Sequence, residues 1–78
     1  MSTQKLRVKS LSGQAKEAIL QYIEEMDLKT DNKLPREEAL AEMLGVSRIT
    51  IRQALNDLAA EGIIFRRQGR GTFVNVDS

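Results

Sequence analysis

Residues 34–62 read LPREEALAEMLGVSRITIRQALNDLAAEG, and this stretch decides the fold. Two runs within it have the apolar spacing of short amphipathic helices, and a single glycine, Gly45, separates them. Gly45 has the backbone freedom that a helix end needs, and Ser47 can cap the next helix by accepting from its free backbone N–H groups. The stretch therefore predicts two short helices joined by a tight turn, which can present the second helix to a groove in DNA.

The first of these helices is predicted to begin at Pro35, because the fixed φ of proline suits a first helical position. Glu37 and Glu38 follow in the first turn, where the helix dipole favours acidic side chains. Val46 is expected to fill the turn after the helix. The positions expected to face the core are Ala39, Leu40, Met43 and Leu44.

The second helix is predicted to span residues 48–61, and its two faces differ in chemistry. At about 100° per residue, the residues that share a buried face with Ile51 are Ala54, Leu55 and Leu58. The residues on the opposite face and its edges are Ile49, Gln53, Asn56, Ala60, Arg48, Arg52 and Thr50.

This outer face suits the reading of base edges. Arginine can bond to guanine, glutamine to adenine, and a methyl-bearing side chain can touch the methyl group of thymine. A solvated helix face with one exposed apolar residue, Ile49, is the alternative, since isolated apolar residues on protein surfaces are common. The helix by itself leaves both interpretations open.

After the second helix, the sequence predicts a β-hairpin. Residues 63–68 and 72–76 are rich in β-branched, aromatic and basic side chains, and Gly69-Arg70-Gly71 lies between them. A hairpin directly after a recognition helix is a wing, and Arg70 at its tip can enter the minor groove, where negative potential attracts guanidinium. An ordinary sheet hairpin with a solvated tip is the alternative.

Before residue 34, the sequence predicts a flexible tail over residues 1–10 and an amphipathic helix over residues 11–27. Ser10 or Ser12 can cap this helix, and Lys33 with Leu34 can form a short edge strand. The apolar positions of the helix are Leu11, Ala15, Ala18, Ile19, Tyr22, Ile23 and Met26. The expected fold is α+β, with a three-helix core followed by a two-stranded wing, in one domain over residues 11–76.

Composition narrows the function. The 78 residues make one small domain, and they include no Cys and no His, which removes disulfides and most nucleophiles, bases and metal ligands. The side chains of adjacent residues on a helix point in different directions, so Glu24 and Glu25 do not suggest a catalytic carboxylate pair. We therefore expect that the chain is not an enzyme and binds no metal and no cofactor. No apolar run approaches the ~20 residues that span a bilayer, so no membrane partner is expected and a cytoplasmic location fits.

The net charge of +1 argues neither for nor against binding to nucleic acid, but the charges are unevenly distributed along the chain. Residues 62–76 contain Arg66, Arg67 and Arg70 and no acid, and residues 44–56 contain two further arginines and no acid. Acidic residues crowd the middle of the chain. The fold can therefore bring two basic segments to one side, opposite an acidic side.

Residues 34–74, which end in RRQGRGTFV, resemble the winged helix-turn-helix DNA-binding domain of GntR-type bacterial transcriptional regulators, and most closely the HutC-like branch. The resemblance implies that the chain is the operator-reading domain of a transcriptional repressor. It also implies that this domain binds double-stranded DNA in a sequence-specific manner. It places helix 48–61 in the major groove and the wing tip, residues 68–71, in the minor groove. A winged-helix module that binds protein is the alternative.

The resemblance also implies roles for individual residues. Arg48 is expected to read a guanine edge, and Gly69 to let the wing backbone approach the groove floor. The residues expected to meet bases or a groove are Arg48, Ile49, Thr50, Gln53, Gln68, Gly69 and Arg70. Those expected to hold phosphates are Arg36, Ser47 and Arg52, with Thr50 matching both groups.

The chain departs from the family pattern at two places. The family commonly has Ser at the position of Arg36 and Arg at that of Glu38. Because two residues rotate a side chain by about 200° on a helix, it stays open whether Arg36 reaches the same phosphate. Ile49 stands where the family usually has a small hydroxyl residue, which predicts contact with a thymine methyl or another apolar base edge.

Family members usually continue into a larger C-terminal domain that binds a small metabolite and dimerises. This chain stops at Ser78, so we expect that effector domain to be absent from it. The resemblance implies an inverted-repeat operator and a homodimer in the full-length protein, with a small-molecule effector if a C-terminal domain exists. RNA binding is disfavoured, because the major groove of A-form duplexes is too narrow for a helix.

Overall fold

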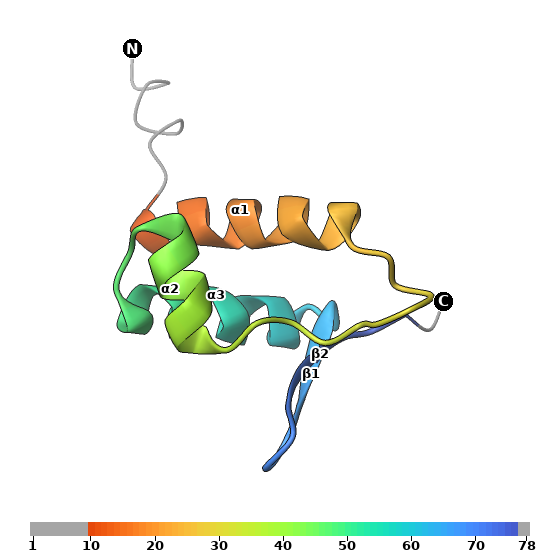
Figure 1. The fold of residues 1–78 in the computed structure, drawn as a ribbon. Helices are drawn as coiled ribbons and strands as arrows, with labels where there is room; N and C mark the ends of the chain where they lie inside the picture. The colour runs from red at the N-terminus through yellow and green to blue at the C-terminus, as the bar shows by residue number, and fades with distance from the viewer. Residues whose placement is uncertain (1–9, 77–78) are drawn as a thin grey trace.

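The computed structural model describes residues 10–76, within which it contains three helices followed by an antiparallel hairpin (Figure 1). The elements in chain order are α1 (Leu11–Glu25), α2 (Glu37–Leu44), α3 (Arg48–Ala60), β1 (Ile64–Arg67) and β2 (Gly71–Val74). This order confirms the predicted α+β fold, a winged helix-turn-helix. Apart from Ser10, the predicted flexible tail lies outside the described residues.

Helix α1 begins where the sequence predicts, because Ser10 caps it by accepting from the backbone N–H of Gly13 at 3.0 Å. Its buried stripe is Ala15, Ile19 and Ile23. The helix ends at Glu25, two residues earlier than predicted, since Met26 adopts an extended backbone. Leu11, expected to face the core, is 62% exposed because it lies in the first turn, beyond the packed part of the helix.

Helix α2 begins later than predicted. Arg36, with φ −67° and ψ 161°, is the N-cap, so Pro35 lies outside the helix. The cause lies in Leu34, whose backbone N–H donates to the carbonyl of Thr72 at 2.9 Å and holds the chain extended up to this point. Leu40 is buried, whereas Met43 is 54% exposed, because this eight-residue helix covers the core with one narrow stripe.

Helix α3 packs against α1 and carries the predicted buried face. Its fully buried residues are Ile51, Ala54, Leu55 and Leu58. The Gly45 backbone has φ +71°, in the left-handed conformation expected at the turn, and Val46 packs partly buried against the core. Helix α3 ends at Ala60, one residue before the predicted end. Glu61, the next residue, forms an ion pair with Lys16 of α1.

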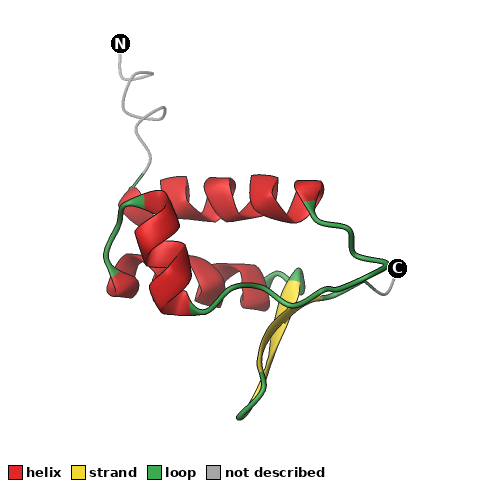
Figure 2. Cartoon of the chain, in the orientation of Figure 1, coloured by secondary structure: helices red, strands yellow, loops and turns green. Residues whose placement is uncertain are grey.

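The hairpin is anchored at its base and exposed at its tip. Ile64 pairs with Val74, and both are buried. Lys33 forms a single isolated bridge to Phe73, and the Val74 N–H donates to the Asn32 carbonyl at 2.7 Å. The predicted edge strand is thus reduced to one bridge beside the hairpin, whose sheet has two strands. Figure 2 shows the hairpin projecting from the α3 side of the molecule, away from α1.

Both strands are shorter than predicted, and the turn between them lies one residue earlier. The N–H of Arg70 donates to the carbonyl of Arg67 at 2.9 Å, which closes the turn around Gln68 and Gly69. Gly71 therefore already belongs to β2, where it pairs with Arg67. The tip of the wing consists of residues 68–70.

Replacing Leu58 by Ala should lower the free energy of unfolding by about 2–5 kcal/mol, because it removes a fully buried side chain and leaves a cavity between helices. Urea denaturation followed by circular dichroism measures the change. Leu11→Ala is the matched control, since the same atoms are removed from an exposed position, and its effect should stay within about 0.5 kcal/mol. Equal losses in the two variants would contradict this account of the core.

Candidate nucleic-acid interface

A wide surface hollow of about 790 Å³ lies between the start of α2, the first half of α3 and the wing. Residues 33–38, Arg48, Arg52 and residues 66–72 line it. The wing and the recognition helix therefore contribute to the same face of the molecule. This is the arrangement that the sequence requires for a helix and a wing to meet one duplex.

The hollow is mainly basic. Within the described part of the chain, the seven basic residues that line it are Lys33, Arg36, Arg48, Arg52, Arg66, Arg67 and Arg70. Glu37 and Glu38 line it as well. The two basic segments do come together as predicted, but these two glutamates lie among them rather than on an opposite side, because the first turn of α2 faces α3.

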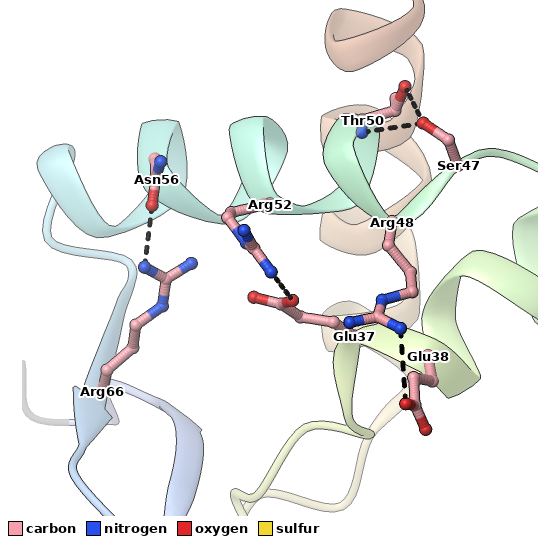
Figure 3. A network of polar contacts seen from close by, with 8 residues as sticks. All are labelled: Glu37, Glu38, Ser47, Arg48, Thr50, Arg52, Asn56 and Arg66. Carbon is pink, nitrogen blue, oxygen red and sulfur yellow. Dashed lines mark hydrogen bonds and ion pairs between the residues drawn. The ribbon is translucent and has the colours of Figure 1, made fainter.

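The first turn of α3 is fixed by a local hydrogen-bond pair. Ser47 accepts from the backbone N–H of Thr50 at 3.1 Å, which confirms the predicted cap. The two hydroxyl oxygens also lie 2.9 Å apart (Figure 3). Both hydroxyls are thus held together at one edge of the outer face of the helix.

The outer face of α3 is open to solvent. Ile49 is 69% exposed, and Gln53 and Asn56 are exposed beside it. An isoleucine at this position contributes nothing to the core, which is formed by the opposite side of the helix. The predicted face is therefore available to a partner.

Two arginines of α3 reach across to the first turn of α2 (Figure 3). Arg48 Nη1 lies 3.5 Å from Glu38 Oε2, and Arg52 Nη2 donates to Glu37 Oε1 at 3.1 Å. Exposed ion pairs of this kind stabilise a protein by about 1 kcal/mol or less. Both guanidinium groups are therefore held in place and can still exchange their partners for a ligand.

A hydrogen bond connects the wing to α3. Arg66 Nη1 on β1 donates to Asn56 Oδ1 on the outer face of α3 at 2.7 Å (Figure 3). Phe65 stacks on Phe73 with ring centroids 5.7 Å apart, and Arg67 lies 5.8 Å from the centre of the Phe65 ring. These contacts stiffen the strands below the tip.

Glycines shape the wing where it turns. Gly69 has φ +78°, and Gly71 has φ +127°, both in the region that favours glycine. A Cβ at Gly71 would also lie 3.0 Å from Cε of Lys33, so the Lys33 side chain passes close over the backbone of β2. Gln68 and Arg70 flank Gly69 at the exposed tip.

The structure places most of the predicted site residues around one surface. Arg36, Arg48, Arg52 and residues 68–70 line the hollow, while Ile49 and Gln53 lie on the exposed outer face of the same helix. Whether each of them touches DNA stays a prediction. The charged lining residues to which the sequence analysis gave no individual binding role are Lys33, Glu37, Glu38, Arg66 and Arg67.

Other kinds of site find no support in residues 10–76. In that range no group of three or more His, Cys, Asp or Glu side chains is placed to hold a metal ion. None of the helices described there combines the length and the apolar character needed to cross a membrane. The basic hollow is thus the surface on which a functional assignment depends.

The helix-turn-helix, the hairpin after it and the basic face they share define a winged helix-turn-helix domain. Residues 11–74 match the family model described as bacterial regulatory proteins, gntR family. The chain belongs to this family, which confirms the resemblance seen in the sequence.

Named relatives agree with this assignment. The chain is 45% identical over 62 residues to the HTH-type transcriptional repressor NagR of Bacillus subtilis (strain 168), covering 80% of this chain and 26% of that protein. It is 41% identical over 64 residues to the histidine utilization repressor of Pseudomonas putida, covering 82% of this chain and 26% of that protein. These relatives support the HutC-like branch. The chain spans about a quarter of their length.

Solved structures of DNA-binding domains and transcriptional regulators are similar to this chain in both fold and sequence. A crystal structure of the NTD of AraR in complex with mutant ORR3 matches with a TM-score of 0.76 and 40% identity, covering 87% of this chain and 97% of that one. AraR(DBD) in complex with operator ORX1 matches with a TM-score of 0.73 and 38% identity, covering 87% and 82%. The possible transcriptional regulator YydK from Bacillus subtilis matches with a TM-score of 0.77 and 33% identity, covering 90% and 31%.

Replacing Ser47 by Ala should lower the free energy of unfolding by about 1 kcal/mol, because the N–H of Thr50 loses its cap. Urea denaturation measures the change. Thr30→Ala is the control, since its hydroxyl donates to the Asp27 side chain in the loop after α1 and lies at no helix start. If both variants lost the same stability, the cap would not be what fixes the start of α3.

Proposed function

We propose that this chain is the operator-reading domain of a bacterial transcriptional regulator and binds double-stranded DNA in a sequence-specific manner. The observation that carries the proposal is the basic hollow shared by α3 and the wing, beside an exposed apolar residue on the recognition helix. A basic face supplies affinity for phosphates, and the mixed chemistry of the helix supplies discrimination among bases.

In the proposed complex α3 lies in the major groove. Arg48 donates to the edge of a guanine, Gln53 bonds a base further along the groove, and Ile49 contacts a thymine methyl or another apolar base edge. These side chains come from one exposed face of a helix whose other face is fixed in the core. Ser47, Arg52 and Arg36 hold phosphates at the rim, and Thr50 stands between the two groups.

The wing enters the neighbouring minor groove. Gly69 lets the backbone of the tip approach the groove floor, and Arg70 places its guanidinium in the negative potential of the groove, with Gln68 beside it. The stacked phenylalanines support the two strands of the wing, and the bond from Arg66 to Asn56 connects the wing to α3. Helix and wing thus bind one duplex together.

The protein to which this domain belongs is proposed to act as a repressor in the bacterial cytoplasm. Relatives named as repressors are about four times as long as the matched segment, which leaves room in such proteins for a C-terminal domain. We place a homodimer and a small-molecule effector in that longer protein, with an operator of two inverted half-sites. A single domain binds one half-site and therefore binds weakly.

Replacing Arg48 by Ala should weaken binding of the cognate duplex by about 1–3 kcal/mol and relax discrimination at one base position. Fluorescence anisotropy with cognate and scrambled duplexes at fixed salt measures both effects. Lys29→Ala removes one positive charge from the exposed loop after α1 and is the control for net charge. An Arg48→Ala protein that distinguished the duplexes as well as the wild type does would refute the base-reading role.

Replacing Arg70 by Ala should weaken binding of the tested duplexes by similar factors and reduce the salt dependence of log K by about one unit of slope, because one cation leaves the minor groove. Titrations over a range of salt concentrations give the slope. Lys29→Ala again serves as the control. An unchanged slope and affinity in Arg70→Ala would place the wing outside the interface and favour a domain that binds protein.

A further inference from the structure

Glu38 is out of place on a surface that binds a polyanion. Its side chain is 73% exposed and lies in the basic hollow, with one carboxylate oxygen 3.5 Å from Arg48 Nη1. We propose that Glu38 is a specificity-determining residue that accepts a hydrogen bond from the N4 amino group of a cytosine next to the guanine read by Arg48. The proposal rests on the DNA-binding function proposed above.

A carboxylate in this position weakens binding to most duplexes. In the proposed complex the first turn of α2 lies beside the phosphates that Arg36 and Arg52 hold, and like charges repel. Removing water from the carboxylate adds a further cost unless a donor takes the place of that water. Glu38 therefore discriminates against every sequence that offers it no donor.

Base chemistry identifies the donor. In the major groove, cytosine presents its N4 amino group, guanine presents two acceptors, and thymine presents an acceptor and a methyl group. Adenine has an amino donor at N6, but its acceptor N7 lies beside it and repels a carboxylate. Cytosine is therefore the base that fits Glu38.

The ion pair determines where that cytosine lies. Because Glu38 and Arg48 contact one another, they meet the groove side by side and read bases of two neighbouring pairs. The guanidinium has five donors, so Arg48 can bond to guanine while it keeps its contact with the carboxylate. The two side chains then recognise guanine and cytosine as one unit.

The neighbouring glutamates do not fit this role. Glu37 is 30% exposed in its side chain and is engaged with Arg52 at 3.1 Å, which makes it a support for that arginine. Glu42 is exposed on α2 but does not line the hollow. Glu42 therefore supplies a matched control with the same charge on the same helix.

The test selects bound duplexes from a random pool with the 78-residue wild-type chain, Glu38→Ala and Glu42→Ala, after circular dichroism has established that all three fold. Alanine removes the carboxylate and leaves no side-chain acceptor in its place. The wild type and Glu42→Ala should enrich a guanine with a cytosine at an adjacent pair. Replacing the pair that holds this cytosine, while the guanine read by Arg48 is kept, should weaken their binding about five-fold. Glu38→Ala should lose this difference and bind the exchanged duplex more tightly than the wild type does.

A chemical probe tests the contact directly. N4-methylcytosine still pairs with guanine through its remaining N4 hydrogen, and the methyl group then occupies the major-groove position of the donor. Placing it at the selected cytosine should weaken wild-type binding about five-fold and leave the binding of Glu38→Ala nearly unchanged.

Two outcomes would overturn the inference without touching the proposed function. Glu38→Ala could strengthen binding to all duplexes by the same factor as Glu42→Ala does, which would show that Glu38 acts only through its charge. Glu38→Ala could also keep the full preference for cytosine. If the wild type enriched no motif and bound without salt dependence, the proposed function would fail and the inference with it.

Discussion

The packing of one side of α3 against α1 is the constraint on which the rest of the structure depends. Ile51, Ala54, Leu55 and Leu58 are almost completely excluded from water, so the rotation of α3 about its own axis is fixed. Once that side is inside, Ile49 and Gln53 have to face solvent. The surface offered to a duplex is therefore set by the core, and a change in the core that rotated the helix would alter which bases it meets.

Local rules were enough to predict much of the fold and part of the site. The period of apolar residues in α3 gave its buried face and its outer face, and Ser47 and Gly45 marked the turn correctly because capping and left-handed backbone depend on near neighbours. Pro35 misled, since a hydrogen bond from Leu34 to a residue 38 positions later keeps this segment extended. The role of the acids in α2 was missed for the same reason: their partners are 10 and 15 residues away.

Ion pairs between α2 and α3 set both the order and the net charge of this surface. The arginines of α3 are held by carboxylates of α2 before any ligand arrives, so their side chains lose less freedom when they bind. Each carboxylate also reduces the net positive charge of the hollow, which lowers affinity for DNA of arbitrary sequence. Lower affinity for arbitrary DNA favours a protein that has to find a few specific sites among many non-specific ones.

The bridge between Lys33 and Phe73, together with the bond from Leu34 to Thr72, has a mechanical consequence. The segment that leads into α2 is joined to the base of the wing by a single β-bridge and by backbone hydrogen bonds, so the wing and the first turn of α2 are mechanically coupled. A displacement of the base of the wing would therefore be transmitted through the backbone to Glu37 and Glu38.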